Sequence, residues 1–547
     1  MGDGRLPGMR SLAHSLAALL MLTSCKIASK PVENSPAIRA THIRVAILDP
    51  GKIDPSSASS SSAMLILKQI CDTLTIVDPV TGAVKPGIAA SWAMAPDAKK
   101  VTFKIRPGLR FHNGREVVAA DFVTSFSRFA SPTSGSSQHF FLEKVVGYQD
   151  LRSGRSTNLA GVKAVDATTL EVGLSEPFAE FPTILSHPAA GAPIPAESLA
   201  DGGAFAALPD CAGPYVLSSP RTTGDIHLVR APGYEPSQGA THPDALKGIP
   251  EEMTFKVVAD VQTGYKELIA KKVDVAEVPT TELLSAQRAR GRVESGQNGL
   301  MTYIGFPVTR APYDQLEFRR ALTLATNQGA IVEELLAGSR VLPRSFLPLS
   351  TGPDSRGLSC ASLLDRRSDL VEARKSLKDS GVDVASVTPT VHLNSGAGHE
   401  RWVELLTTRW KEQLGVTTTL KAAEWKTYLD GLVDPGPDGP FRLGWASRFP
   451  SPESILDPLF RSGSLDNFTR YSNPAFDQAL ATARSTIDDI KRKKAYRDAA
   501  DILCKDLPII PMWEGRNNIA FGPGIASGTG RRLDFDGDPM LRELGRR

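Results

Sequence analysis

Apolar and polar side chains alternate along several short segments of this chain, and in other segments apolar residues recur every three or four positions. Residues 101–106 alternate with the two-residue period of a half-buried strand, and apolar side chains from Val117 to Phe126 follow the spacing of an amphipathic helix. Between these segments lie the turn-forming pairs Pro107-Gly108 and Asn113-Gly114. The pattern predicts a strand, a tight turn, a second short strand ending at Asn113-Gly114, and a helix.

The same two periodicities alternate along the rest of the chain. Strand-like runs are found at residues 43–48, 252–258, 272–277 and 507–513, and a hairpin is predicted at 162–174. Helical spacing predicts helices at residues 63–74, 370–379 and 400–414. Strands and helices that alternate in this way indicate an α/β fold.

Length and charge limit the number of domains and the kinds of partner. The chain has 547 residues, far more than one ordinary hydrophobic core accommodates, so two or three substructures are expected. Lys and Arg number 63 against 60 Asp and Glu, which leaves a net charge of only +3, and no long basic run is interleaved with aromatic residues. Nucleic acid is therefore not an expected partner.

The first 25 residues have the pattern of a secretory signal. Arg5 and Arg10 precede an apolar run at residues 16–22, which is too short to span a bilayer and stops at Leu22-Thr23-Ser24-Cys25. Small residues followed at once by Cys resemble a lipobox. We therefore expect residues 1–25 to be a lipoprotein signal peptide ending at the lipidated Cys25, and residues 26–42 to be a flexible tether. The alternative is an ordinary signal peptide followed by a buried cysteine.

Motifs for catalysis, metal binding and redox chemistry are absent from the sequence. It contains no G-x-S-x-G and no H-E-x-x-H, so an extracytoplasmic hydrolase is the weaker class, and neither a cofactor nor a metal is expected. His112 and His139 are interpreted as solvated or structural. Beyond Cys25, disulfides and buried free thiols both stay open for the remaining four cysteines, Cys71, Cys211, Cys360 and Cys504.

Residues 86–129 carry the most specific pattern in the chain. They contain A-x-W, then an Asp, then T-F-x-I-R-x-G-x-x-F-x-x-G, then A-x-D-F. This order resembles the signature of family 5 solute-binding proteins, the extracytoplasmic receptors of peptide-importing ABC transporters. Phe318-Arg-Arg-Ala-Leu is similar to a second motif of that family, and residues 161–177 and 424–430 look closest to its oligopeptide-binding branch. The resemblance runs from about residue 43 to about residue 530.

The resemblance implies an α/β, two-lobed fold of the periplasmic-binding-protein type (class II), with an extra domain inserted in the first lobe and crossing strands between the lobes. The implied segments are residues 43–72 for the first part of lobe I, 73–205 for the inserted domain II, 206–299 for the second part of lobe I, 300–512 for lobe II (domain III), and 513–547 for the C-terminal return to lobe I.

The resemblance also implies a ligand-binding segment. Arg442, Gly444 and Trp445 match R-x-G-W-x-x-D-Y, in which the Gly-Trp main chain borders the ligand, the Arg can meet the carboxylate of a short peptide, and the Asp holds the N-terminal ammonium. In this chain Arg448 occupies the Asp position. A guanidinium would repel a desolvated ammonium by several kcal/mol.

Three interpretations of Arg448 stay open. The ligand is an anionic or N-blocked peptide-like molecule that Arg448 binds, or Asp54, Glu453 or Asp457 supplies the acid instead, or the site has lost this ligand class. Asp54 matches a ligand-facing Glu of the family, and the alternative is a turn-capping carboxylate.

Two further correspondences follow from the resemblance. Trp425 matches a pocket-lining Trp, with a core indole as the alternative. The two positions of the family disulfide fall on Leu300 and Ala446, so that bridge is expected to be lost.

The function implied by the resemblance is binding followed by lobe closure. We expect a monomeric, lipid-anchored substrate-binding component of an ABC importer, on the periplasmic or cell-surface side of a bacterial membrane. It would capture peptides or peptide-like ligands and deliver them to permease subunits. The alternative is a lipid-anchored sensor or binding protein for an anionic or N-blocked ligand, without transport.

Overall fold

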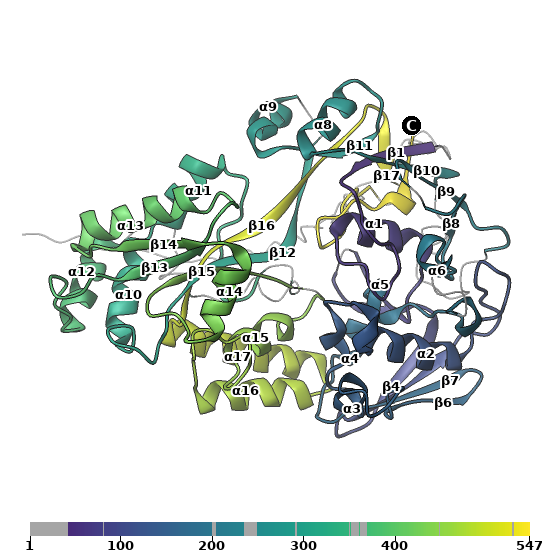
Figure 1. The fold of residues 1–547 in the computed structure, drawn as a ribbon, viewed down its shortest axis with the longest axis horizontal. Helices are drawn as coiled ribbons and strands as arrows, with labels where there is room; N and C mark the ends of the chain where they lie inside the picture. The colour runs from purple at the N-terminus through teal and green to yellow at the C-terminus, as the bar shows by residue number, and fades with distance from the viewer. Residues whose placement is uncertain are drawn as a thin grey trace, which may run out of the picture. The chain divides into compact units, whose positions relative to one another are not determined.

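The described part of the chain is a mixed α/β structure built around one large sheet (Figure 1). The computed structural model describes residues 42–79, 81–199, 204–221, 223–234, 249–289, 293–348, 351, 360, 369–447, 449–527 and 530–546. Within these ranges, no helix combines the length and the apolar character needed to cross a bilayer.

The large sheet has ten strands, contributed from both ends and the middle of the chain. In spatial order they are β14 (Thr419–Ala423), β13 (Thr390–Asn394), β15 (Phe441–Ala446), β12 (Val293–Gly305), β16 (Ile509–Phe521), β11 (Val275–Glu277), β1 (His42–Ile47), β10 (Glu252–Val257), β9 (Ile226–Arg230) and β8 (Tyr215–Leu217).

Two strands of 13 residues, β12 and β16, connect the two halves of this sheet. They pair antiparallel from Val293↔Ala520 to Gly305↔Ile509, with irregularities between Gln297 and Met301 and between Thr302 and Tyr303. On the far side of β12 lies β15, and on the far side of β16 lies β11. Figure 1 shows β12 and β16 running side by side between the two groups of strands. This arrangement agrees with the expected crossing strands.

A separate four-stranded antiparallel sheet has the order β4 (Ala89–Met94), β5 (Lys100–Ile105), β7 (Thr169–Gly173) and β6 (Val162–Asp166). Helix α2 (Ala119–Ala130) packs on it through Phe122, Phe126 and Phe129, which are almost completely buried. The predicted strand, turn and helix of this segment are confirmed. These elements fall within the predicted domain at 73–205, whose boundaries stay a prediction.

The second short strand predicted in this segment is wrong. Only a single bridge, Arg110↔Glu116, is formed there. The backbone N–H of His112 donates instead to the carbonyl of Cys211, and the Arg110 side chain donates to the carbonyl of Gly114. The backbone N–H groups of Phe111 and Val117 still donate to the carbonyls of Arg115 and Leu109, so the segment is a tight hairpin turn that is too short to form a strand.

Helix α1 (Ser61–Ile70) begins where Ser60 caps the backbone N–H of Ala63. It ends four residues before the predicted end at Leu74, because Cys71 adopts an extended conformation and forms a disulfide with Cys211. The predicted helices at 370–379 and 400–414 match α12 (Leu370–Asp379) and α13 (Glu400–Leu414).

The remaining strands and helices complete both halves. They are β2 (Thr75–Val77), β3 (Val84–Pro86), α3 (Tyr148–Arg152), α4 (Phe181–Ile184), α5 (Pro188–Gly191), α6 (Ala204–Ala207), α8 (Val261–Ile269), α9 (Leu283–Arg288), α10 (Leu316–Ala325), α11 (Gln328–Leu336), α14 (Trp425–Val433), α15 (Glu453–Phe460), α16 (Pro474–Ser485), α17 (Asp489–Asp506), β17 (Ile525–Ser527) and β18 (Leu544–Arg546).

The four cysteines within the described residues form two disulfides, Cys71–Cys211 and Cys360–Cys504. This pairing settles the alternative that the sequence left open. Leu300 and Ala446, on which the resemblance places the family bridge, stand directly opposite each other in the β12–β15 register. An apolar cross-strand pair therefore occupies the place of that bridge.

Candidate functional site

The main cavity has a volume of about 530 Å³, within the range of about 300–1,000 Å³ that is usual for small-ligand sites. Its wall comes from β1, α1, α8, β11, the middle of β12, the end of β15, β16, Gln138, residues 187–188 and the loop at residues 534–539. Residues from both halves of the ten-stranded sheet therefore meet around one space.

Two strands beside this cavity have an edge that is only partly covered. In the parallel pairing of β13 with β15, the register is limited to His392↔Phe441. The pairing of β11 with β1 is likewise limited to Val45↔Val275. Among the described residues, no further residue pairs with these neighbours are formed after Phe441 and after Val45, although the carbonyl of Arg442 accepts from the Tyr428 hydroxyl. An extended ligand can pair with the main chain beyond these positions as an added strand.

Strand β15 brings together three of the predicted site residues, Arg442, Gly444 and Trp445. The Trp445 indole donates through Nε1 to the carbonyl of Ser454 at 2.7 Å, which fixes its orientation. A Cβ at Gly444 would lie 3.6 Å from Nη2 of Arg442, so the glycine and the guanidinium are close neighbours. The strand then continues into Ala446 and Ser447, which line the main cavity.

Arg442 is a buried cation that has no acidic partner among the described residues. Its side chain is 8% exposed, and Nη1 donates to Oδ1 of Asn394 at 3.1 Å. Nε has no acceptor, and among the residues that the structure describes no carboxylate forms an ion pair with this guanidinium. Burial lowers the pKa of Arg442 to about 10, although Tyr428 and Tyr303 act in the opposite direction. A buried, unpaired guanidinium favours an incoming anion.

The positive charge of Arg442 acts on the pKa of His399. Burial and then the positive charge of Arg442 lower the pKa of His399 to about 4. Nδ1 of His399 accepts a hydrogen bond from the Trp402 indole at 3.3 Å, which requires that nitrogen to be unprotonated. His399 is therefore neutral at neutral pH.

The other predicted site residues lie apart from this strand. Asp54 is 3% exposed and pairs with Arg128 of α2, with an Nη1–Oδ1 distance of 2.7 Å. It also accepts from the backbone N–H of Ser56. Trp425 begins α14 with 46% of its surface exposed and its ring 6.2 Å from that of Tyr428. Arg448 and Cys25 fall outside the described residues.

Glu453 and Asp457, the two other acids considered from the sequence, belong to a buried ion cluster. Glu453 accepts from Nε of Arg484 at 2.6 Å, and Asp457 pairs with Lys144 at 3.3 Å and also with Arg484. Burial alone would raise the pKa of Asp457, but Lys144 and Arg484 outweigh it and lower the value to about 2. Neither acid lines the main cavity.

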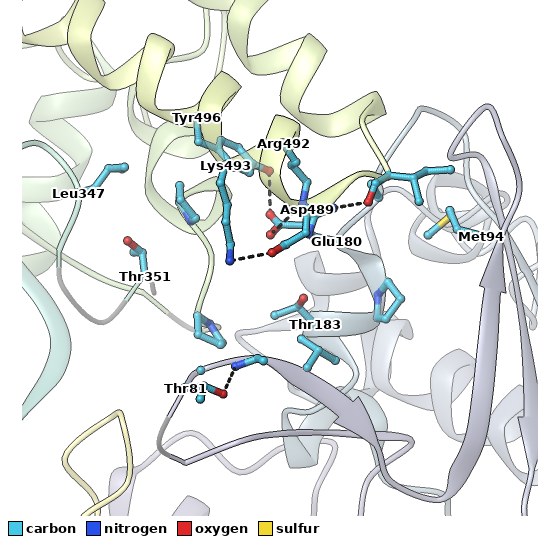
Figure 2. A pocket seen from close by; sticks show the side chains of 18 of the residues that line it. Thr81, Met94, Glu180, Thr183, Leu347, Thr351, Asp489, Arg492, Lys493 and Tyr496 are labelled. Atoms are coloured by element: carbon cyan, nitrogen blue, oxygen red, sulfur yellow. Dashed lines mark hydrogen bonds and ion pairs between the residues drawn. The ribbon is translucent and has the colours of Figure 1, made fainter. Parts of the chain in front are cut away.

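A second cavity of about 330 Å³ lies between the β2–β3 turn, residues 179–183 and α17 (Figure 2). Glu180 accepts from the Tyr496 hydroxyl at 2.8 Å and pairs with Nε of Arg492 at 3.4 Å, while Asp489 pairs with Arg492 and Lys493 at 2.7 Å each. Most charges in this wall are therefore neutralised within the protein. A third cavity of about 290 Å³ shares Lys68, His187, Pro188, Asp536 and Pro539 with the main cavity.

The wall of the main cavity carries charged and hydrogen-bonding side chains, among them Lys68, Gln138 and Asp536. In the part of the chain that the structure describes, no three His, Cys, Asp or Glu residues are grouped to hold a metal ion. Gln138 and Asp536 line the cavity and were missed from the sequence. The signal available for Asp536 was the alternation Asp534-x-Asp536-x-Asp538, and Gln138 had none.

Comparisons with known proteins add a family and a fold. Residues 83–467 match the sequence model of the bacterial extracellular solute-binding proteins, family 5 Middle. The chain is 28% identical over 549 residues to the periplasmic oligopeptide-binding protein OppA of Salmonella typhimurium, covering 95% of each chain. It is 27% identical over 486 residues to the probable deoxycholate-binding periplasmic protein YgiS of Escherichia coli, covering 85% of this chain and 86% of the relative.

Among solved structures, the unliganded open form of the periplasmic murein tripeptide-binding protein MppA superposes with a TM-score of 0.79. The match covers 93% of this chain and 97% of that one at 22% identity, which supports the fold alone. The predicted α/β, two-lobed class of fold is confirmed.

Proposed function

Because the chain belongs to the bacterial extracellular solute-binding proteins of family 5, we propose that it is the substrate-binding component of an ABC importer for peptides or peptide-like ligands. The Salmonella relative is named as an oligopeptide-binding protein, which supports the peptide class. The Escherichia coli relative is named as a probable deoxycholate-binding protein, so binding of an anionic non-peptide ligand should be tested beside binding of peptides.

The observation that carries this proposal is the buried, unpaired guanidinium of Arg442 on a strand that leads into the main cavity. A ligand carboxylate at Arg442 would supply the counter-charge that the described residues do not. The partly covered edges of β15 and β1 would then pair with the ligand main chain on either side, which is recognition that does not depend on side-chain identity.

Gly444 and Trp445 have the role of a main-chain border in this proposal, and the exposed Trp425 offers an apolar wall. The pairing of Asp54 with Arg128 gives it a structural role in the ligand-free protein. Its predicted contact with ligand stays a prediction, which Asp54→Asn would test by a change in affinity that exceeds any change in stability.

Arg448 carries a separate hypothesis that comes from the sequence alone. If Arg448 binds a carboxylate or carbonyl, anionic or N-acetylated peptides bind more tightly than free-amine peptides, and Arg448→Ala removes that difference. Tightest binding of free-amine peptides, unaffected by Arg448→Ala in isothermal titration, would reject this hypothesis.

The anchor and the delivery step complete the proposal. Lipidation of Cys25, followed by the tether at residues 26–42, would hold the binding domain at the outer face of a membrane, where a closed, ligand-loaded monomer meets permease subunits. Metabolic labelling with a radioactive fatty acid tests the anchor: the wild-type chain should incorporate label and Cys25→Ala should not.

Isothermal titration tests the ligand class. The mature protein would be titrated with short peptides, with the same peptides amidated at the C-terminus, and with deoxycholate. The proposal predicts binding of carboxylate-bearing peptides, weakened by amidation. Binding of deoxycholate without any peptide would replace peptides by an anionic amphiphile as the ligand class, and binding of neither would reject the proposal.

A further inference from the structure

The loop at residues 534–538 places three carboxylates beside a single ammonium in the wall of the main cavity. Lys68 Nζ lies 2.7 Å from Asp538 and 3.2 Å from Asp534. Asp536 and Asp538 line the cavity together with Lys68, and so does Glu277, an exposed carboxylate of β11. The carboxylates therefore outnumber the ammonium in this part of the wall.

Asp536 is the unpaired member of the group. Asp534 accepts from the backbone N–H groups of Asp536 and Asp538, and Asp538 accepts from Asn517 at 3.3 Å. Within the described ranges, the Asp536 carboxylate takes part in no hydrogen bond or ion pair. Burial raises the pKa of Asp536 well above its ordinary range. Lys68 opposes this change, and Asp534 and Asp538 add to it. Lys68 is thus shared among three acids, and among the described residues it forms ion pairs only with Asp534 and Asp538.

The loop cannot easily move Asp536 out of the cavity. Gly537 has φ +74°, and a Cβ there would lie 2.7 Å from the carbonyl carbon of Gly296 in β12. A Cβ on Gly296 would lie 2.3 Å from Cα of Gly537. Two glycines in direct backbone contact hold the loop against β12, one of the two strands that connect the halves of the sheet.

A second and independent observation comes from a distant part of the sequence. Gln138 lines the same cavity with only 4% of its surface exposed, and its Oε1 has no hydrogen-bond partner among the described residues. An amide oxygen accepts hydrogen bonds and cannot donate them. A buried acceptor without a donor is unfavourable, so Gln138 favours a ligand that brings an N–H group.

We infer that the main cavity takes a cationic, N–H-bearing group of the ligand, such as a primary ammonium, with Asp536 as its counter-charge and Gln138 as an added acceptor. The inference rests on the proposed function and narrows its ligand class. In this inference, Asp536 of the loop at residues 534–538 supplies the acid that the family motif carries where this chain has Arg448. It also opposes the hypothesis of an N-blocked ligand, since the two predict opposite preferences for a free amine.

The test is isothermal titration of the mature protein with one peptide in two forms, with a free and with an acetylated N-terminus. A charge-assisted hydrogen bond in a partly desolvated site predicts that the free-amine form binds about 10- to 100-fold more tightly. In Asp536→Asn this preference should fall to about 3-fold or less, while affinity for the acetylated form stays within about 2-fold. Gln138→Leu should weaken the free-amine form alone. Asp498→Asn, on the exposed face of α17, is the matched control and should change neither value.

The outcomes separate the two proposals. If wild type binds both forms equally, or if Asp536→Asn keeps the preference, this inference fails while the peptide function stands. If wild type binds neither form, the peptide function fails and this inference falls with it.

The melting temperature of the ligand-free protein provides a second readout. Because Asp536 has no ion-pair partner among the described residues, Asp536→Asn should leave the melting temperature unchanged or raise it. If Asp536 had a purely structural role, the same substitution would lower the melting temperature.

Discussion

Replacing Arg442 by Gln should make the ligand-free protein more stable and the complex weaker. Burial moves the pKa of Arg442 from 12.5 to about 10. At about 1.4 kcal/mol per pKa unit, this difference corresponds to a cost of about 3 kcal/mol for holding the charge in the folded protein. At pH 7 the guanidinium is charged in both folded and unfolded chains, so this cost is fully present.

The neutral variant loses one hydrogen bond, from Nη1 to Asn394, which is worth about 1 kcal/mol. Arg442→Gln should therefore raise the free energy of unfolding by about 2 kcal/mol. Removing one partner of a buried charge pair in the complex costs about 2–5 kcal/mol, or roughly 30- to 4,000-fold in Kd for a carboxylate-bearing ligand.

Urea unfolding of the ligand-free protein and isothermal titration measure the two effects. Arg319→Gln is the matched control, because Arg319 is similarly buried but donates to the main-chain carbonyls of Leu507, Tyr313 and Asp506. The control should lose several kcal/mol of stability, since three acceptors lose their donor. Loss of stability in Arg442→Gln, together with unchanged affinity, would refute the view of Arg442 as an unpaired anion receptor.

Three further predictions concern the surroundings of the site. Gly537→Ala should lower the free energy of unfolding, measured in urea, by about 2–4 kcal/mol, because a positive φ is combined with a 2.7 Å approach to Gly296. The control Gly524→Ala, at φ +80° with open space around it, should lower it by only about 1 kcal/mol. Equal losses would contradict the close contact. The folded-state pKa of His399 is lowered to about 4, whereas its ordinary value is 6.5. The contribution of neutral His399 to the free energy of unfolding is therefore complete above about pH 6.5 and is lost as the pH falls toward 4. The loss is about 2 kcal/mol at most, because the ring is partly exposed. In Arg442→Gln the pKa of His399 should rise but stay below 6.5, measured by NMR titration, and an unchanged value would show that the two groups do not interact. Lys144→Met should lose about 3–5 kcal/mol, because it leaves the buried Asp457 and Glu453 with fewer cations, whereas Lys494→Met on the surface should change stability by less than about 1 kcal/mol; similar losses would contradict the buried cluster.

Local signals predicted the fold well where each element is determined by its own residues. The strand, turn and helix between residues 101 and 130 and the bounds of α12 and α13 follow from periodicity and capping. The end of α1 was wrong because a disulfide to Cys211, 140 residues away, sets the conformation of Cys71. The short strand before Gly114 was wrong because the local hairpin has a single bridge, and the next backbone N–H, that of His112, donates to the distant Cys211.

The site shows the same division between local and distant determinants. Arg442, Gly444 and Trp445 share one strand, so a motif could identify them together. Gln138, Glu277, Ser447 and Asp536 meet only through the folding of four distant segments around the main cavity. Among the described residues, Arg442 has no acidic partner, whereas Asp54 is paired with Arg128. Both are facts about spatial neighbours, which the sequence alone does not contain.

Native mass spectrometry of the mature protein, purified from its own bacterium, tests the central claim most directly, with any bound molecule released and identified by fragmentation. The account predicts a mixture of short peptides or peptide-like molecules that carry both a free carboxylate and a free amine. A bound ligand without a carboxylate, or a single non-peptide amphiphile, would contradict it.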